Sequence, residues 1–457
     1  MKNLSFLYAK SKMMTDSLFD TTTRHYLEVT MKNASRDRPP HKPQDWKNSR
    51  LCQNTPLYSS FTYNYFPFAI ASSSLQAAIR QGNPLEACQW ALEMIRTDSS
   101  LSNEQIQKRG LGISNVWSRL AIISCEDVGL ANPLMCIVMT QILDKKYNNI
   151  DEEETAILNA TILLARSFKT RLVDWSCVCR INPEVKFDNT EASLITYHDK
   201  IIENLKSGNH FHVIAYVEEL VLQSLHDKEV KNKDPFPKTI FNTLAKGVSL
   251  TDSPVKYYKN KRQLIWLCCA KVIYSFIITH PAMSYKYLNV IKIVEACYNL
   301  SHSERFRWSS SARLFENMAV MAICLRDQIE SRGLDLRLAS VEQCFPSNKD
   351  LSQQDIQDFR TQHSNGTIWY GVSEISKDKH TREGTILGRK MQHFIELKAF
   401  VNFEDDAFKE LNDFYLKLCI LTRYNEGSTF NKSGLSPQQY SDWIVELRKR
   451  YDRMAKI

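Results

Sequence analysis

RLAIISCEDVGLANP, from Arg119 to Pro133, is the stretch from which the architecture of this chain is predicted most directly. Leucine, isoleucine and valine recur in it at helical spacing, and Gly129 is placed to end the helix. The Asn-Pro pair that follows opens the next helix. Two acids, Glu126 and Asp127, fall at the C-terminal end of the first helix, where the helix dipole disfavours negative charge. We therefore expect a cation or a neighbouring helix N-terminus to hold them.

The two acids are expected to have separate partners, because adjacent residues of a helix point about 100° apart. One should pair with a cation, for which the candidates are Arg119, Lys169 and Arg171, and the other should cap the backbone near Asn132. Structural ion pairs outnumber functional ones. This network, which also includes Asp174, is therefore interpreted as an organiser of the fold, with a ligand site as the alternative.

Helical patterns on both sides of this stretch predict an all-α protein built as a multi-helix bundle. A helix pair is expected in SSSLQAAIRQGNPLEACQWALEMIRT, starting at a cap on Ser72 and broken at GNP. Two helices should follow the central one, over residues 133–146 and 152–167. Further helices are expected at 192–205, 211–225, 262–279, 285–298, 312–332, 387–402, 405–422 and 437–454. The buried faces of the bundle should carry Trp90, Leu120, Ile123 and Leu163.

The length of 457 residues predicts two or three packed units. Residues 1–56 contain RDRPPHKPQDWKNSR and are expected to form a flexible arm. A helical domain should occupy 57–230, with residues 57–70 extended or paired as strands. A second helical region is expected at 231–366, with a loop-rich part after 332, and a C-terminal helical region at 367–457.

Composition excludes several classes of protein. The net charge of +8 is a mild excess for this length and does not by itself identify a nucleic-acid binder. Cysteines scattered through apolar runs predict a reducing compartment, cytoplasm or nucleus, with an organelle left open. No cysteine pair has the spacing of a zinc site, so no metal or other cofactor is expected. No apolar run is long enough for a membrane span, and we expect a soluble protein.

Three segments carry a resemblance to a known family: SLQAAIRQGNPLEACQWALEMI, SNVWSRLAIISCEDVGLANPLM and AILNATILLARSFKTRLVDW. In this order they are similar to the helical C-terminal part of the replication-associated recombination protein A family (RarA, or MgsA), whose eukaryotic relative is the Werner helicase-interacting protein. The central phrase is the specific one, because Glu, Asp, Gly and Pro recur in register. The resemblance implies a clamp-loader-collar-like bundle in residues 72–175, with roles in oligomerisation and in DNA replication and recombination.

The chain departs from that family in one respect. Family members carry an AAA+ ATPase module with a G-x-x-x-x-G-K-[ST] phosphate loop before the helical part. The nearest imitation here is GTILGRK, Gly384 to Lys390, where the glycines are too close and Met391 stands in place of the magnesium-binding hydroxyl. The sequence therefore predicts no ATP hydrolysis.

Two other stretches are candidates for binding an anion or a nucleic acid. KYYKNKR interleaves tyrosines with Lys256, Lys259, Lys261 and Arg262, and could neutralise and stack on a single strand. The second stretch runs from Tyr370 to Phe394. It gathers polar and basic residues around two glycines, near the start of the expected 387–402 helix: His380, Thr381, Arg382, Arg389, Lys390 and His393. Hydrated surface charge is the alternative for both.

Three functions remain open from the sequence. The first is a non-catalytic replication or recombination accessory protein that forms a homo-oligomer and associates with DNA or with replication proteins. The second is a metal- or phosphate-dependent nucleic-acid enzyme centred on His380 and His393, with Arg382 and Glu383. The third is a purely structural interaction protein. No catalytic residues are assigned, because no nucleophile with its base and no paired carboxylates at metal spacing can be identified.

Overall fold

The computed structural model describes residues 62, 66, 68–95, 112–145, 147–178, 191–226, 273, 276–277, 280, 286–303, 306, 311–334, 336, 354, 357–358, 360–361, 372–377, 381–390, 393, 395, 399–401, 404–425, 436, 438–439, 442–443, 445–446 and 448–449. These residues are mostly helical, which confirms the all-α prediction. The one β feature among them is an isolated parallel bridge between Lys169 and Glu404.

The longer helices are α5 (Phe68–Arg80), α6 (Pro84–Ile95), α8 (Ile113–Ile123), α9 (Leu134–Asp144), α10 (Ile150–Arg166), α12 (Glu191–Ser207), α13 (His210–His226), α17 (Leu288–His302), α18 (Ala312–Cys324) and α24 (Asp406–Asn425). Shorter helices are α11 (Leu172–Val178), α19 (Arg326–Glu330) and α22 (Arg382–Ile386). A π-helix, η2 (Ser124–Val128), and two 3-10 turns, η3 (Gly129–Ala131) and η6 (Glu374–Ser376), complete the set.

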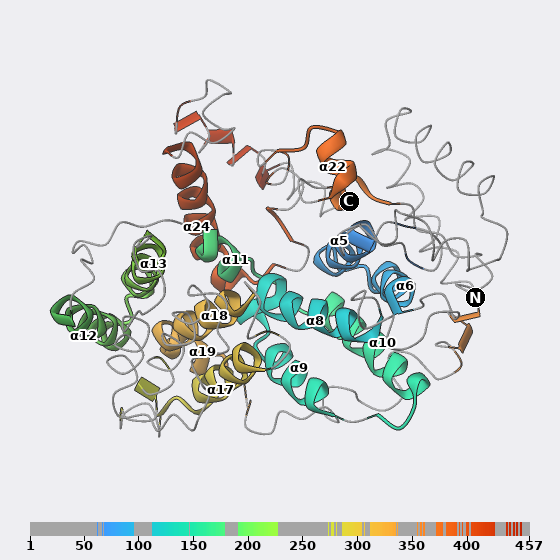
Figure 1. The fold of residues 1–457 in the computed structure, drawn as a ribbon, viewed down its shortest axis with the longest axis horizontal. Helices are drawn as coiled ribbons and strands as arrows, with labels where there is room; N and C mark the ends of the chain where they lie inside the picture. Colours follow the sequence, from blue (N-terminus) through green and yellow to red (C-terminus); the bar gives the residue numbers. More distant parts are fainter. Residues whose placement is uncertain are drawn as a thin grey trace.

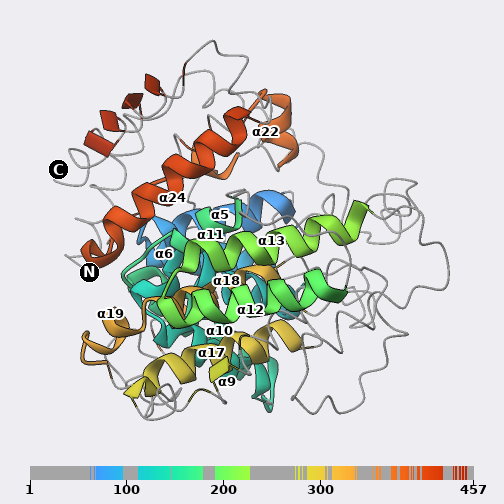
Figure 2. The same cartoon turned by 90° about the vertical axis from the view of Figure 1, so that its left-hand side faces the viewer.

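Helix α8 lies in the middle of the bundle, and α5, α6, α9 and α10 pack around it (Figure 1). Helices α17 and α18 form a closely packed pair, in which α17 lies against α9 and α18 lies against α11. Helices α12 and α13 lie side by side, and α24 packs on α11 along one side of the bundle (Figure 2).

One hydrophobic core runs through all these helices, and its buried members come from each of the three regions expected at 57–230, 231–366 and 367–457. Trp90, Leu120 and Ile123 are fully buried in it. Leu163, expected on a buried face, is half-buried and packs against the core. The helices that follow residue 230 therefore share a core with the central stretch.

The first helix begins earlier than the sequence predicts. Residues 68–70 belong to α5 and are neither extended nor paired as strands, so that expectation is wrong for them. Ser72 is not the cap but a buried residue inside the helix. The reason is tertiary packing, since Phe66 contacts the buried Trp90 edge-on at 5.1 Å between ring centroids and brings this part of the chain onto the core. Burial of the helix thus outweighs the capping preference of serine.

Several other boundaries differ from the sequence predictions. The helix expected over 312–332 is divided at Leu325 into α18 and α19. The helix expected from residue 387 does not begin there, because Leu387 and Gly388 lie in a turn after α22. The arm at 1–56 and most of 262–279 lie outside the described residues.

The contrast between Leu120 and Leu163 gives a matched test of the packing. Leu120 is fully buried, so Leu120→Ala should lower the free energy of unfolding by about 2–5 kcal/mol through the cavity it leaves. Leu163→Ala removes the same atoms from a half-buried site and should cost clearly less. Denaturant titrations of the two variants measure both values, and equal losses would show that α8 is not the buried centre of the bundle.

Candidate functional site

The central stretch does not continue as an α-helix to Gly129. Helix α8 ends at Ile123, and residues Ser124–Val128 form one turn of π-helix, a rare wide turn found often at functional sites. The amide of Gly129 closes this turn by donating to the carbonyl of Ser124. Gly129 has a φ of 52°, and a Cβ atom there would lie 3.4 Å from the carbonyl oxygen of Thr170. A contact at this distance is tolerable, so it is the positive φ that favours glycine here.

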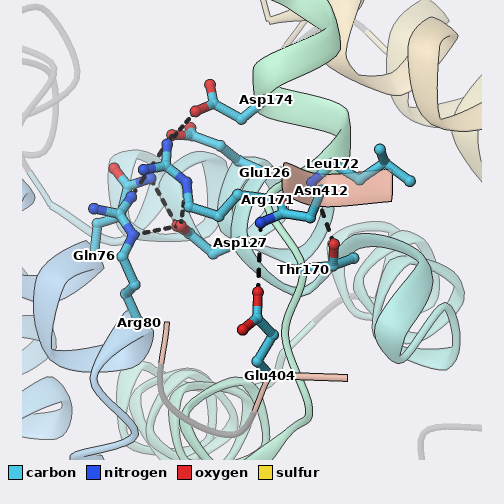
Figure 3. Close-up of polar contacts among 10 residues, drawn as sticks. All are labelled: Gln76, Arg80, Glu126, Asp127, Thr170, Arg171, Leu172, Asp174, Glu404 and Asn412. Carbon is cyan, nitrogen blue, oxygen red and sulfur yellow. Dashed lines mark hydrogen bonds and ion pairs between the residues drawn. The ribbon is translucent and has the colours of Figure 1, made fainter. Parts of the chain in front are cut away.

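Asp127 is the centre of a buried polar network (Figure 3). Its Oδ1 accepts a hydrogen bond from Arg80 Nε at 2.6 Å, and its Oδ2 accepts one from Gln76 Nε2 at 2.8 Å. Arg171 Nε lies 3.6 Å from Oδ1. The side chains of Asp127 and Arg171 are fully buried, and that of Arg80 is 1% exposed. One carboxylate thus ties the π-turn to α5 and to the start of α11.

Glu126 shares the same two cations from the edge of the network. Its Oε1 lies 3.4 Å from Arg171 Nη2 and 3.8 Å from Arg80 Nη2, and its side chain is 16% exposed. Asp174 also accepts a hydrogen bond from Arg171 Nη2. The expectation of separate partners for the two acids is therefore wrong. The acids lie in a π-turn, and the arginines approach from other helices with donors spread along a planar fork.

The two neighbouring acids have different electrostatic environments. Burial opposes ionisation of Asp127, but Arg80 and Arg171 outweigh it and lower the pKa of this carboxyl. Burial, together with the charges of Asp174 and Asp127, raises the pKa of Glu126 to about 7. Asp127 is therefore a permanent anion, whereas Glu126 changes its charge near neutral pH.

Backbone hydrogen bonds also join the π-turn to the residues just before α11. The Thr170 amide donates to the Asp127 carbonyl at 3.0 Å, and the hydroxyl of Thr170 accepts from the Leu172 amide at the start of α11 (Figure 3). Arg171 also stacks its guanidinium over Trp175, 4.6 Å from the ring centroid. Thr170 and Arg171 thus hold the start of α11 against the π-turn.

Among the described residues, Arg171 is the predicted cation that forms ion pairs with both acids. Buried Lys169 instead donates to the carbonyls of Ala165 and Ser167 at 2.7 and 2.8 Å, and burial lowers its pKa to about 8. Arg119 is half-buried, and within the described part of the chain it forms no ion pair with either acid. The candidates thus do not share one role, because Arg171 pairs with the acids whereas Lys169 binds backbone carbonyls at the end of α10.

The turn after the π-helix is capped by a cation, so the expected carboxylate cap near Asn132 is wrong. Arg332 donates to the carbonyls of Leu130 and Ala131 at 2.7 and 2.9 Å, and to Asp405 at 2.6 Å. The exposed groups at the end of a helix are carbonyls, which accept hydrogen bonds and so require a donor. An arginine meets that need and a carboxylate does not.

Sequence reasoning missed Arg80 and Gln76, which supply the two shortest contacts to Asp127. A signal was present, because residues four apart lie on the same face of a helix and this pair falls among buried Leu75, Ala78 and Ile79. An arginine in the last turn of a helix is also favoured by the dipole alone. Because the dipole alone explains an arginine at this position, the sequence does not identify Arg80 as a partner of Asp127.

The two stretches predicted to bind an anion or a nucleic acid are described only in part. Lys256, Lys259, Lys261, Arg262 and His380 lie outside the described residues, as does the side chain of Arg382. Thr381 caps the five-residue helix α22 by accepting from the Gly384 amide at 3.0 Å. Gly388, with φ 66°, ends it, and the Arg389 amide donates to the Gly384 carbonyl. The GTILGRK segment is therefore a helix with its C-terminal turn, not a loop around a phosphate.

A further contact in this stretch joins His393 Nδ1 to the backbone amide of Lys390 at 3.2 Å. The described hydrogen bonds of Thr381 and His393 thus serve local backbone structure. Among the described residues, no group of three His, Cys, Asp or Glu side chains is arranged to hold a metal ion. No described helix combines the length and apolar character needed to cross a membrane.

Comparison with known proteins finds no relative of this chain. No protein-family model, curated protein or solved structure matches this chain. The geometry of the site therefore has to be interpreted from its own residues.

Asp127 and Glu126 should respond differently to neutralisation. Asp127→Asn leaves two buried guanidinium groups without their shared anion, and should lower the free energy of unfolding by about 3–5 kcal/mol. Glu126→Gln removes a partly exposed carboxyl and should cost far less. Denaturant titrations of both variants at pH 7 measure the difference, and equal losses would contradict the central place of Asp127.

The raised pKa of Glu126 predicts a pH dependence of stability. Because this pKa rises from 4.5 to about 7 on folding, the folded state binds the extra proton between these values. Stability should therefore fall as the pH rises through this window and become level above it. The Glu126→Gln variant should lack this component, and Glu203→Gln, on an exposed part of α12, is the matched control. Identical pH profiles for wild type and Glu126→Gln would refute the assignment.

Proposed function

We propose that this chain is a non-catalytic accessory protein of DNA replication or recombination, which assembles with itself and associates with DNA or DNA-processing proteins. The observation that supports the proposal is the set of contacts made by the two acids in SCEDVGL, Glu126 and Asp127. In the family that this stretch resembles, these helices belong to the part expected to oligomerise. Here Asp127 and Glu126 contact the arginines that join α5, the π-turn and α11.

The arrangement favours a scaffold over a reaction centre. The anion with the most contacts, Asp127, is fully buried and has two arginines and an amide as partners. A general base needs to reach a substrate proton, and a side chain with no exposed surface cannot do so without local opening. The network fixes relative helix positions, which is what an assembly domain of the clamp-loader-collar type requires.

DNA association is the part of the proposal that rests on charge. Phosphate contacts release counterions, so the affinity of such a protein falls steeply with salt, by a slope of about 0.9 for each phosphate neutralised. Light scattering of the purified full chain should give a mass above that of one 53.0 kDa copy, and a DNA titration at several salt concentrations should give this slope.

The two basic stretches can be distinguished in the same titration. Changing Lys256, Lys259, Lys261 and Arg262 to glutamine should reduce the salt slope by roughly one for each lost phosphate contact and weaken binding to all sequences similarly. Arg389→Gln with Lys390→Gln tests the second stretch in the same way, and the variant with the larger fall in slope identifies the stretch that contacts phosphate. A monomer without salt-dependent DNA binding would overturn the proposal, and DNA-stimulated ATP hydrolysis would overturn its non-catalytic part.

A further inference from the structure

Glu316 is a buried acid to which the described part of the chain gives no hydrogen bond. It lies on α18, its residue is 2% exposed, and neither carboxyl oxygen has a hydrogen-bond partner among the described residues. Most buried polar groups are paired, and an ionised carboxylate is especially costly to leave unpaired. The other acids discussed above have arginine or amide partners, so Glu316 requires a different explanation.

The carboxyl lines a small pocket between α17 and α18. The pocket has a volume of about 10 Å³, close to the smallest space that accepts one water molecule. Its wall includes both apolar and hydroxyl-bearing side chains: Ile273, Val294, Cys297, Tyr298, Ser301 and Ala319. A water molecule there would find polar neighbours, whereas a larger ligand would not fit.

The charged groups near Glu316 do not offset the cost of burying its ionised carboxylate. Burial raises the pKa of Glu316 well above its ordinary value of 4.5, and Arg313 on the same helix opposes this only in part. From α17, the titratable groups at the pocket are the Cys297 thiol and the Tyr298 hydroxyl. Burial raises the pKa of the Cys297 thiol, which keeps it uncharged near pH 7. From α11, Cys177 lies by the Arg313 carbonyl at 3.9 Å, and burial raises the pKa of its thiol to about 12.

We propose that this pocket is a water-binding site that holds Glu316 in its protonated form, and that loss of the proton loosens the packing of α17 against α18. A protonated carboxyl can donate one hydrogen bond to a bound water and accept another from it. An ionised one would require several waters in a space that holds one. Helix α18 also contacts η2 and α11, so a shift of α18 would be felt at the π-turn.

The matched variant is Glu316→Gln, which keeps the shape of the side chain and removes its ionisation. Below the folded-state pKa and above 4.5, the unfolding equilibrium constant of the wild type should rise about tenfold per pH unit relative to this variant. Denaturant titrations from pH 5 to 9 measure that ratio. Glu295→Gln, on a half-exposed part of α17, is the control and should give a constant ratio.

A ratio for Glu316→Gln that does not change with pH would overturn the proposal. A second measurement needs no variant to fold: infrared spectroscopy of the wild type should show a buried carboxylic acid band, in addition to that of Glu126, which persists well above pH 4.5. A crystal structure should place one water within hydrogen-bond distance of Glu316. A dry pocket, or a Glu316 carboxyl that ionises near pH 4.5, would contradict the assignment.

Discussion

The ion pair between Arg80 and Asp127 is the interaction on which the rest of this structure depends. Two charges with almost no exposed surface lie 2.6 Å apart, and Arg171 and Gln76 complete the surroundings of the acid. Burying an ion pair costs desolvation energy that the attraction only roughly offsets, so such a pair is poor evidence of added stability. Its effect is on geometry, because loss of either partner leaves an unpaired buried charge. Even in the intact network, Arg80 Nη1 has no hydrogen bond within the described part of the chain.

This constraint extends through the backbone to the later helices. Asp127 positions the π-turn, and its carbonyl receives the Thr170 amide. The neighbouring Lys169 carbonyl accepts from the Asp405 amide, which places the start of α24. Arg332 then joins the Asp405 side chain to the turn at Leu130. Segments about 200 residues apart in the sequence therefore meet around one turn of helix.

The sequence is most informative where periodicity and buried volume act together. Helical spacing predicted α9, α10, α12, α13 and α24 to within a few residues, because their apolar faces meet the core at regular intervals. Helical spacing did not predict the backbone where packing between distant segments determines its conformation. The π-turn depends on an arginine from α5 and an amide from the 167–171 segment, and neither lies near it in the sequence.

The sequence predicts where the candidate site lies, but not which residues pair with one another in it. Glu126 and Asp127 stand out because two acids at a helix end require partners, and Arg171 was a correct candidate. Arg80 was hidden by its favourable position in the last turn of α5, and Arg332 by its place after α19. Glu316 gives no signal in sequence, since a glutamate among apolar residues is common on half-exposed helices. Only the folded chain shows that neither of its carboxyl oxygens has a hydrogen-bond partner among the described residues.

A double-mutant cycle between Arg80 and Asp127 tests the central claim most directly. Arg80→Met and Asp127→Leu remove each charge with side chains that can pack, and the free energies of unfolding of both single variants and the double variant are measured together. If the pair organises the π-turn, the double variant should be more stable than the sum of the single losses predicts, with a coupling energy of about 2–3 kcal/mol. Losses that add to within about 0.5 kcal/mol would contradict the account, because residues that do not interact behave in that way.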